Sequence, residues 1–140
     1  MNSIKSYKDL IVWQKSIDLV TDTYKLINQI PKVEEYALSA QMRRSAVSIP
    51  SNIAEGTGRY YSKEYCRFLQ ISRGSLYELQ TQITIAQNLG YISDFDLIKQ
   101  IETKAAEVER MLNKMIATLN NCNQSAPEKT PDAKQQYSQR

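Results

Sequence analysis

Apolar side chains return every three or four positions through four stretches of this chain, and that period constrains the fold more than any other feature. Residues three and four apart share one face of an α-helix, so each stretch is predicted to be an amphipathic helix with one buried stripe. In the first stretch, from Tyr7 to Asn28, the stripe comprises Leu10, Trp13, Ile17, Val20, Tyr24 and Ile27. The other three stretches run from Glu34 to Glu55, from Ser62 to Gly90 and from Ser93 to Leu119.

Residues that start or end helices lie between the stretches. Ser6 with Asp9 three positions later resembles a capping box, and Ser62 and Ser93 are candidate N-caps. Pro31 is expected to end the first helix, because the residue before a proline is pushed out of the α region.

A proline and two glycines lie near the end of the second predicted helix. We expect Pro50 to kink this helix without ending it, since the apolar period continues to Ile53. Gly56 and Gly58 are expected to supply the left-handed residues that a helix end needs.

Short connections place consecutive helices antiparallel. The chain is therefore predicted to be all-α, an up-down-up-down four-helix bundle over residues 1–121. The remaining residues, 122–140, have one aromatic side chain and no apolar face. Such a segment cannot bury enough surface to offset its ordering entropy, so we expect a disordered tail.

The first helix carries a second apolar stripe, opposite the first. Its members are Val12, Leu19, Leu26 and Ile30. A helix in a four-helix bundle needs one buried face, and a long apolar strip on a monomer is a liability. We interpret this stripe as the interface of a homo-oligomer. The alternative is a wider intramolecular core or a few exposed apolar residues, which are normal.

Several kinds of chemistry lack their residues here. The chain has no histidine, and its two cysteines, Cys66 and Cys122, share no CxxC spacing. Histidine-dependent catalysis and a zinc site are therefore not expected. The glycines after Ile53 do not fit GxxxxGK[ST] and follow no strand, so they predict no phosphate loop. We expect no catalytic residue, no metal and no cofactor.

No stretch of the chain approaches the roughly 20 apolar residues that span a bilayer. The N-terminus likewise has no apolar run of signal-peptide length. We expect a cytoplasmic protein with no membrane partner.

Polar and small residues in the second and third stretches form a separate group. Pro50, Asn52, Glu55 and Gly56 make a compact motif in which Asn52 and Glu55 lie about one helical turn apart. The motif could bind a cation or a partner, but hydrogen bonds to a neighbouring helix or loop explain it more simply. Gly74, inside the third helix, is expected to allow close approach of another helix.

Positive charge is concentrated between Gln41 and Arg73. This segment has two carboxylates and six cations, so its net charge is +4, whereas the whole chain carries +3. The cations are Arg43, Arg44, Arg59, Lys63, Arg67 and Arg73. Arginine suits bidentate phosphate contact, and the interleaved Tyr60, Tyr61 and Tyr65 could stack on exposed RNA bases. These residues are candidate nucleic-acid contacts. The alternative is a solvated face with surface ion pairs.

Three blocks of the sequence carry a family resemblance: KDLIVWQKSIDLV, LSAQMRRSAVSIPSNIAEGTGR and FLQISRGSLYELQTQITIAQNLGYI. Together they resemble the four-helix-bundle proteins encoded in intervening sequences of bacterial 23S ribosomal RNA, and the related accessory variability protein of diversity-generating retroelements. The resemblance implies a homopentameric ring and, for the retroelement relative, RNA and a reverse transcriptase as partners. It offers no catalytic residues, and it matches Arg43, Arg44 and Arg59 to positively charged positions.

These observations predict a non-enzymatic homo-oligomer, a pentamer by resemblance. We expect it to bind structured RNA, or a protein that handles RNA, through an Arg-rich face of the second and third helices. The alternative is a protein-interaction scaffold without affinity for nucleic acids.

Overall fold

A computed structural model describes residues 5–59 and 62–119, and within them four long α-helices and no strand are present. The helices are α1 (Ile11–Ile27), α2 (Leu38–Thr57), α3 (Ser62–Asn88) and α4 (Phe95–Leu119). Short 3-10 turns precede α1 (η1, Tyr7–Asp9) and α2 (η2, Lys32–Glu34). The predicted all-α class is confirmed. The predicted tail, 122–140, lies outside the described residues.

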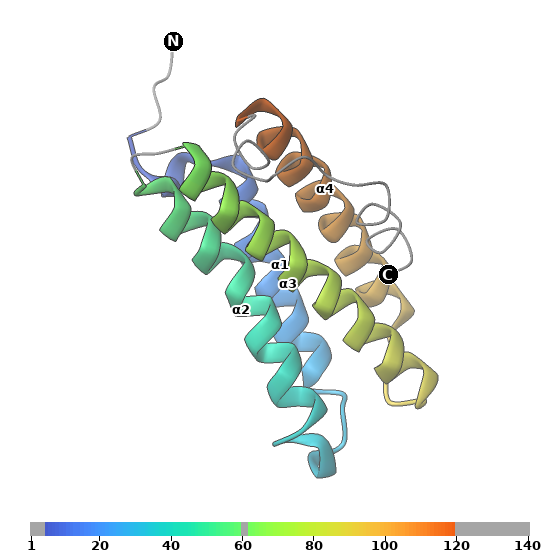
Figure 1. Cartoon of the computed structure of the whole chain (residues 1–140). Coiled ribbons are helices and arrows are strands. Elements are labelled where there is room, and N and C mark those ends of the chain that lie inside the picture. Colours follow the sequence, from blue (N-terminus) through green and yellow to red (C-terminus); the bar gives the residue numbers. More distant parts are fainter. Residues whose placement is uncertain (1–4, 60–61, 120–140) are drawn as a thin grey trace, which may run out of the picture.

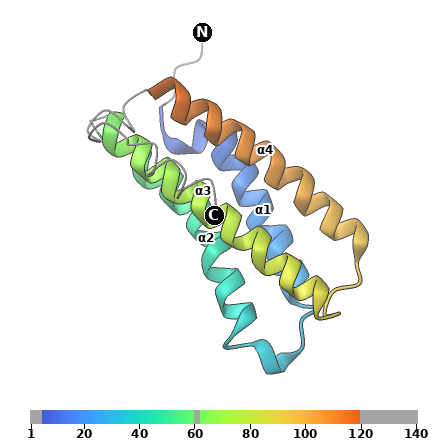
Figure 2. The same cartoon turned by 45° about the vertical axis from the view of Figure 1, so that its right-hand side comes forward.

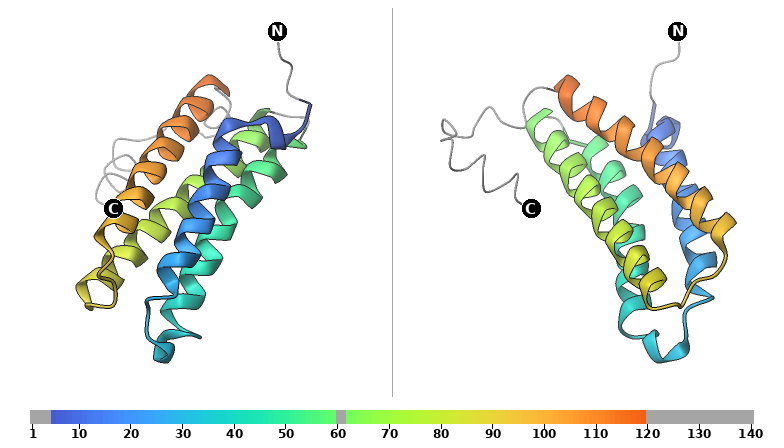
Figure 3. Two further views of the ribbon diagram at one scale, coloured as in Figure 1. Left: turned by 180° about the vertical axis from the view of Figure 1, so that it is seen from behind. Right: turned by 90° about the vertical axis from the view of Figure 1, so that its right-hand side faces the viewer.

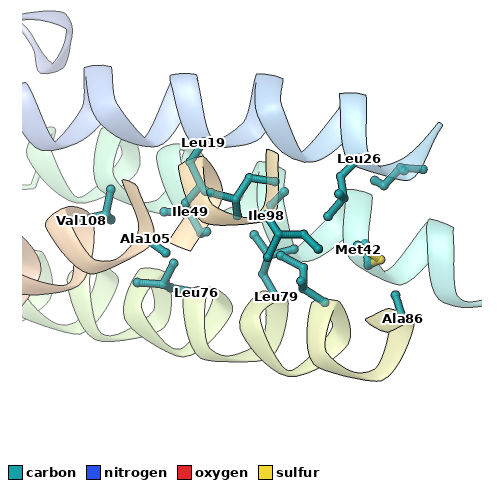
Figure 4. Packing of buried hydrophobic residues seen from close by; sticks show 14 of the residues in the cluster. Leu19, Leu26, Met42, Ile49, Leu76, Leu79, Ala86, Ile98, Ala105 and Val108 are labelled. Carbon is teal, nitrogen blue, oxygen red and sulfur yellow. The ribbon is translucent and has the colours of Figure 1, made fainter. Parts of the chain in front are cut away.

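The four helices run alternately up and down and surround one core (Figure 1). Each packs against its neighbours in the chain, and α1 also packs against α4, which closes the bundle (Figure 2). Figure 4 shows how side chains from all four helices meet in the middle, among them Leu19, Met42, Leu76 and Ile98. This is the predicted up-down-up-down bundle.

The N-terminal ends of helices α1 and α4 differ in detail from the predicted ones. The capping box of Ser6 and Asp9 is present, with the Ser6 hydroxyl accepting from the Lys8 amide at 3.0 Å. It opens the turn η1 and not the long helix, because Leu10 is extended and α1 starts only at Ile11. Helix α4 is capped by Asp94 instead of Ser93, since the Asp94 carboxylate accepts from the Leu97 amide at 3.0 Å.

Helix α2 continues through Pro50 to Thr57, as expected. The left-handed role expected for Gly56 and Gly58 is wrong: Gly56 lies buried within the helix, and Gly58 has a φ of −80°. Among the described residues the positive-φ glycine is Gly90, with φ 75°, and it closes α3 as expected.

The core face of α1 is centred on the second stripe and not on the first. Of the first stripe, Ile27 is buried as expected, and Leu10, Trp13 and Val20 are partly buried against the core. Val12, Leu19, Leu26 and Ile30 are between 0% and 7% exposed and belong to the core. They are therefore not available as an oligomer interface, and that prediction is wrong. In contrast, Ile17 is 37% exposed and Tyr24 42%.

Two polar residues explain this difference. Ser16 and Thr23 are fully buried within the true core stripe of α1. Each hydroxyl donates to a carbonyl of its own helix at 2.7 Å, Ser16 to Trp13 and Thr23 to Leu19. Because these hydrogen bonds satisfy the hydroxyl groups, burying them costs little. Hydropathy alone breaks the stripe at both positions and so favours the other face.

Candidate functional site

Serine side chains line the contact between α2 and α3. The Ser48 and Ser75 hydroxyl groups share a hydrogen bond of 2.8 Å, and the Ser45 hydroxyl donates to the Gln82 side-chain oxygen at 2.7 Å. Because serine is small and these hydroxyl groups are paired, the two helices approach closely along a polar seam. The seam also fixes the register of the pair: Ser48 lies opposite Ser75, and Ser45 opposite Gln82.

An open pocket of about 540 Å³ lies along this seam, and we call it the seam pocket. Its lining residues are Gln41, Arg44, Ser45, Ser48, Ser75 and Glu78. Arg44 comes from α2 and Glu78 from α3, and both are exposed. Neither forms an ion pair with another residue of the described part of the chain. The pocket therefore offers a cation, a carboxylate, hydroxyl groups and an amide to a ligand.

On the other side of α2, against α1, the surface is apolar. Figure 3 shows these two helices side by side. A hollow of about 390 Å³ lies between them, and we call its apolar lining the α1–α2 strip: Trp13, Ile17, Val20, Val47, Pro50 and Ala54. Val47 is 43% exposed and Ile17 37%. The strip is therefore a surface on which a second apolar surface could pack.

A further hollow, of about 490 Å³, continues this surface toward the start of α2. Tyr24, Ala40, Arg43, Arg44, Val47 and Ser48 line it. It shares Arg44 and Ser48 with the seam pocket, so Arg44 borders both. Tyr24 is 42% exposed here, which leaves part of its ring free beside a guanidinium group.

The six predicted nucleic-acid contacts do not form one cluster. Arg43 and Arg44 lie near the start of α2, while Arg59 follows its end. Arg59 comes sixteen positions after Arg43, a distance of about 24 Å at the rise of an α-helix. Lys63 and Arg67 are exposed in the first turns of α3, near Arg59.

Three of these cations already have partners. Arg43 pairs with the Glu35 carboxylate at 3.3 Å. Arg59 pairs with Glu55 at 2.6 Å. Arg73 donates to the Asn113 side chain of α4 at 2.7 Å, so it faces away from the seam. Arg44, Lys63 and Arg67 remain exposed, with no ion pair to any described residue.

The tyrosines that were expected to stack on RNA bases beside these cations are not seen to form an exposed aromatic surface in the described residues. Tyr60 and Tyr61 fall outside the described residues. Tyr65 is half-buried and packs against the core. Arg59 instead lies over the ring of Phe68, with its guanidinium carbon 4.9 Å from the ring centroid. Such a cation–π contact helps to hold Arg59 at the end of α2.

The Asn52 and Glu55 motif makes hydrogen bonds and an ion pair within the bundle. The Asn52 amide donates to both the backbone oxygen and the hydroxyl of Ser48, each at 2.8 Å. It thus supports the serine that reaches α3. Glu55 is exposed and contacts Arg59 on its own helix end. The two side chains do not converge on one cation site.

Two tyrosine hydroxyl groups donate to carboxylates across the bundle. Tyr77 of α3 donates to Glu109 of α4 at 2.7 Å, and its pKa is raised by burial and then by this hydrogen bond. Tyr91 donates to Glu34 of η2 at 2.9 Å, and this hydrogen bond is the main cause of its raised pKa. Both contacts join separate elements and stabilise the bundle from its surface.

The described residues contain neither a candidate metal site nor a helix that could span a membrane. No group of three or more Cys, Asp or Glu side chains there could hold a metal ion. None of the helices in that part combines the length and the hydropathy needed to cross a membrane.

Tyr24 and Glu78 were not expected in a site. Tyr24 fits the apolar period of the first stretch, which predicts a place in the core. Glu78 resembles any exposed carboxylate of a helix. A signal for Glu78 exists in the spacing: Arg44 and Ser48 are one turn apart on α2, and Ser75 and Glu78 are one turn apart on α3. Only the pairing of α2 with α3 brings these groups together.

Comparison with known proteins adds the family. Residues 8–114 match the family described as 23S rRNA-intervening sequence protein. A solved structure is similar in fold: a protein with unknown function from the S23 ribosomal protein family, from Bacteroides thetaiotaomicron VPI-5482. It has 22% sequence identity and a TM-score of 0.67, and the alignment covers 76% of this chain and 98% of that one. A comparison with curated proteins gives no match. The matched residues include all of α1, α2 and α3 and most of α4, and the chain belongs to the 23S rRNA-intervening sequence protein family.

Proposed function

We propose that this protein is a non-enzymatic homo-oligomer that binds structured RNA in the cytoplasm. The observation that carries the RNA part is the position of Arg44. It is an exposed cation without an ion pair in the described part of the chain, between a hollow that contains Tyr24 and the polar seam pocket.

RNA recognition uses the groups that surround Arg44. Unstacked bases stack on aromatic rings, and arginine contacts phosphates or base edges. Tyr24 supplies a half-exposed ring and Arg44 the cation. Lys63 and Arg67, at the far end of the α2–α3 pair, add a second cationic position for the backbone of a longer RNA.

Self-association is proposed through the α1–α2 strip. Trp13 and Ile17 on α1 and Val47 on α2 present a continuous apolar surface that the bundle leaves partly open. A pentameric ring, as the family resemblance implies, would repeat each Arg44 site five times and so raise the avidity for one RNA. The strip replaces the buried face of α1 as the proposed interface.

The retroelement relationship is part of the same proposal. The sequence blocks that resemble the accessory variability protein of diversity-generating retroelements support a reverse transcriptase as a protein partner. An oligomer with several Arg44 sites would then hold the RNA on which that enzyme works.

The RNA part is tested with a labelled structured RNA and the full chain. Wild-type affinity should fall steeply as salt rises, because bound phosphates release counterions. Arg44→Glu should weaken binding at least about tenfold, which corresponds to about 1.4 kcal/mol. The matched control is Arg110→Glu, which makes the same charge change on the exposed surface of α4. An equal loss in both variants would show a general charge effect with no site at Arg44.

A second candidate function is a protein-interaction scaffold without nucleic-acid affinity. The observation that favours it is that Arg43, Arg59 and Arg73 already have partners within the bundle. Absence of RNA binding by the wild-type protein at low salt would favour the scaffold and contradict the RNA proposal.

A further inference from the structure

We infer that the seam pocket selects an unpaired guanine base, held between Arg44 and Glu78. This inference rests on the proposed RNA function and deepens it, because it assigns base specificity to one pocket and to one carboxylate. Glu78 is the residue proposed to determine specificity.

The register of α2 and α3 places the two charged groups at one level. Ser48 is hydrogen-bonded to Ser75 across the seam. Arg44 lies one turn before Ser48, and Glu78 lies one turn after Ser75. Because α2 and α3 are antiparallel, both steps lead in the same direction along the bundle (Figure 1). Arg44 and Glu78 therefore border the pocket from opposite sides at about the same height.

The space between these two groups is open. Their side chains lie farther apart than an ion pair, since no pair between them falls within 4.0 Å. The pocket of about 540 Å³ occupies this region. The polar side chains along its seam side already have hydrogen-bond partners, because Ser48 is hydrogen-bonded to Ser75 and Ser45 to Gln82. The charged groups with unused hydrogen-bonding capacity are thus the guanidinium of Arg44 and the carboxylate of Glu78, and the exposed Gln41 amide also lines the pocket.

Guanine is the base whose edges match this pair of groups. An ionised carboxylate only accepts hydrogen bonds, and an arginine only donates them. Guanine presents two adjacent donors, N1–H and the N2 amino group, on its Watson–Crick edge, and two acceptors, O6 and N7, on the next edge. Glu78 would accept from the donors while Arg44 donates to the acceptors.

The other bases fit less well. Adenine and cytosine each place an acceptor nitrogen beside their single amino group, and uracil flanks its N–H with two carbonyl oxygens. A carboxylate facing any of these edges meets at least one lone pair, which is repulsive. The base must also be unpaired, because a Watson–Crick partner would occupy the edge that Glu78 reads.

The neighbouring hollow supports a strand that continues past the pocket. Arg44 and Ser48 line both hollows, and Tyr24 lies in the second one. A guanine in the seam pocket and an adjacent base stacked on Tyr24 would share Arg44 between them. This arrangement suits a single-stranded loop in a structured RNA.

The test measures fluorescence anisotropy of the full chain with labelled uridine hexamers that carry one central guanine or adenine. The guanine hexamer should bind about tenfold more tightly, since a good bidentate contact discriminates between bases by a factor of that order. Glu78→Gln should bring the guanine-to-adenine ratio close to one. The matched control, Glu102→Gln on the exposed surface of α4, removes the same charge and should keep the ratio.

The outcomes separate the two proposals. Equal affinity of the wild type for both hexamers would overturn the guanine pocket and leave the RNA function standing. A ratio that survives Glu78→Gln would also overturn it. Failure of the wild type to bind either hexamer or any structured RNA would overturn both. Far-ultraviolet circular dichroism checks that each variant keeps its helices.

Discussion

Gly56 of α2 lies so close to Phe68 of α3 that a Cβ atom on the glycine would stand 2.9 Å from the Phe68 Cβ. Tyr65 meets the same position, with its ring carbon Cδ1 also at 2.9 Å and its backbone oxygen at 3.3 Å. No side chain fits there without a shift of the two helices. Of the glycines in the described residues, Gly56 is the one at which an added side chain would collide with a neighbouring helix.

Gly56→Ala should therefore destabilise the protein. The added methyl group meets a Cβ and a backbone oxygen, which cannot rotate away as a flexible side chain would. Overpacking of this kind costs about 1–3 kcal/mol. Urea unfolding followed by circular dichroism measures the loss of unfolding free energy. An unchanged midpoint would mean that α2 and α3 are farther apart than described.

Gly74→Ala is the matched substitution, and it is expected to raise the free energy of unfolding where Gly56→Ala lowers it. The sequence predicted close helix packing at Gly74, and that prediction is wrong: Gly74 is exposed, and an added Cβ meets nothing within 4 Å. Alanine is the better helix former by about 1 kcal/mol. The same urea titration should show higher stability, and a loss of stability would contradict the open surface around Gly74.

The orientation of α1 shows where a sequence-based prediction of this fold succeeds and where it fails. The period of apolar residues predicted four helices and their order, because burial of one stripe per helix is a strong constraint. It centred the buried face of α1 on the wrong stripe, because hydropathy treats Ser16 and Thr23 as solvent-exposed. Their hydroxyl groups are satisfied by their own helix, which hydropathy does not register.

Paired substitutions on the two faces of α1 test this orientation. Leu19 is fully buried, so Leu19→Asp should prevent folding or cost several kcal/mol. Ile17→Asp, on the α1–α2 strip, should keep the helices and lower the native mass of the oligomer. Light scattering combined with circular dichroism separates the two effects. If Ile17→Asp leaves the mass of an oligomer unchanged, the strip is not its interface.

The candidate site was only partly predictable, for a different reason. Arg44 was expected as an RNA contact from local charge. Glu78 and Tyr24 were not, because their relation to Arg44 depends on how α1, α2 and α3 pack. Serine pairs such as Ser48 and Ser75 set that register, and a single sequence does not reveal which serines face each other.

A partly buried ion pair joins α1 to α4, with the Lys104 side chain 31% exposed. The Asp22 carboxylate, 8% exposed, lies 2.5 Å from the Lys104 ammonium group. Asp22→Asn keeps the shape but leaves the lysine without its counter-charge, so stability should fall by about 1–3 kcal/mol. The control is Asp18→Asn, which removes the same charge from an exposed position of α1. Equal stability of both variants in urea would mean that the Asp22–Lys104 pair contributes no net stability.

The hydrogen bond between Tyr77 and Glu109 should make stability depend on pH in the alkaline range. Burial, together with this bond, raises the pKa of Tyr77 above its ordinary value of 10.0, so the folded state holds the phenolic proton more tightly than the unfolded chain. The stabilisation is thus fully present below pH 10 and is lost as pH rises through the folded pKa.

Tyr77→Phe removes this linkage, and its comparison with the wild type isolates the effect from all other titrating groups. The wild type should lose its advantage over the variant as pH rises above 10, with unfolding free energies taken from urea titrations on either side of that value. Glu109→Gln should lower the pKa of Tyr77 toward 10, because it removes the charged acceptor. A stability difference that stays constant across this range would show that the phenol titrates alike in the folded and unfolded states.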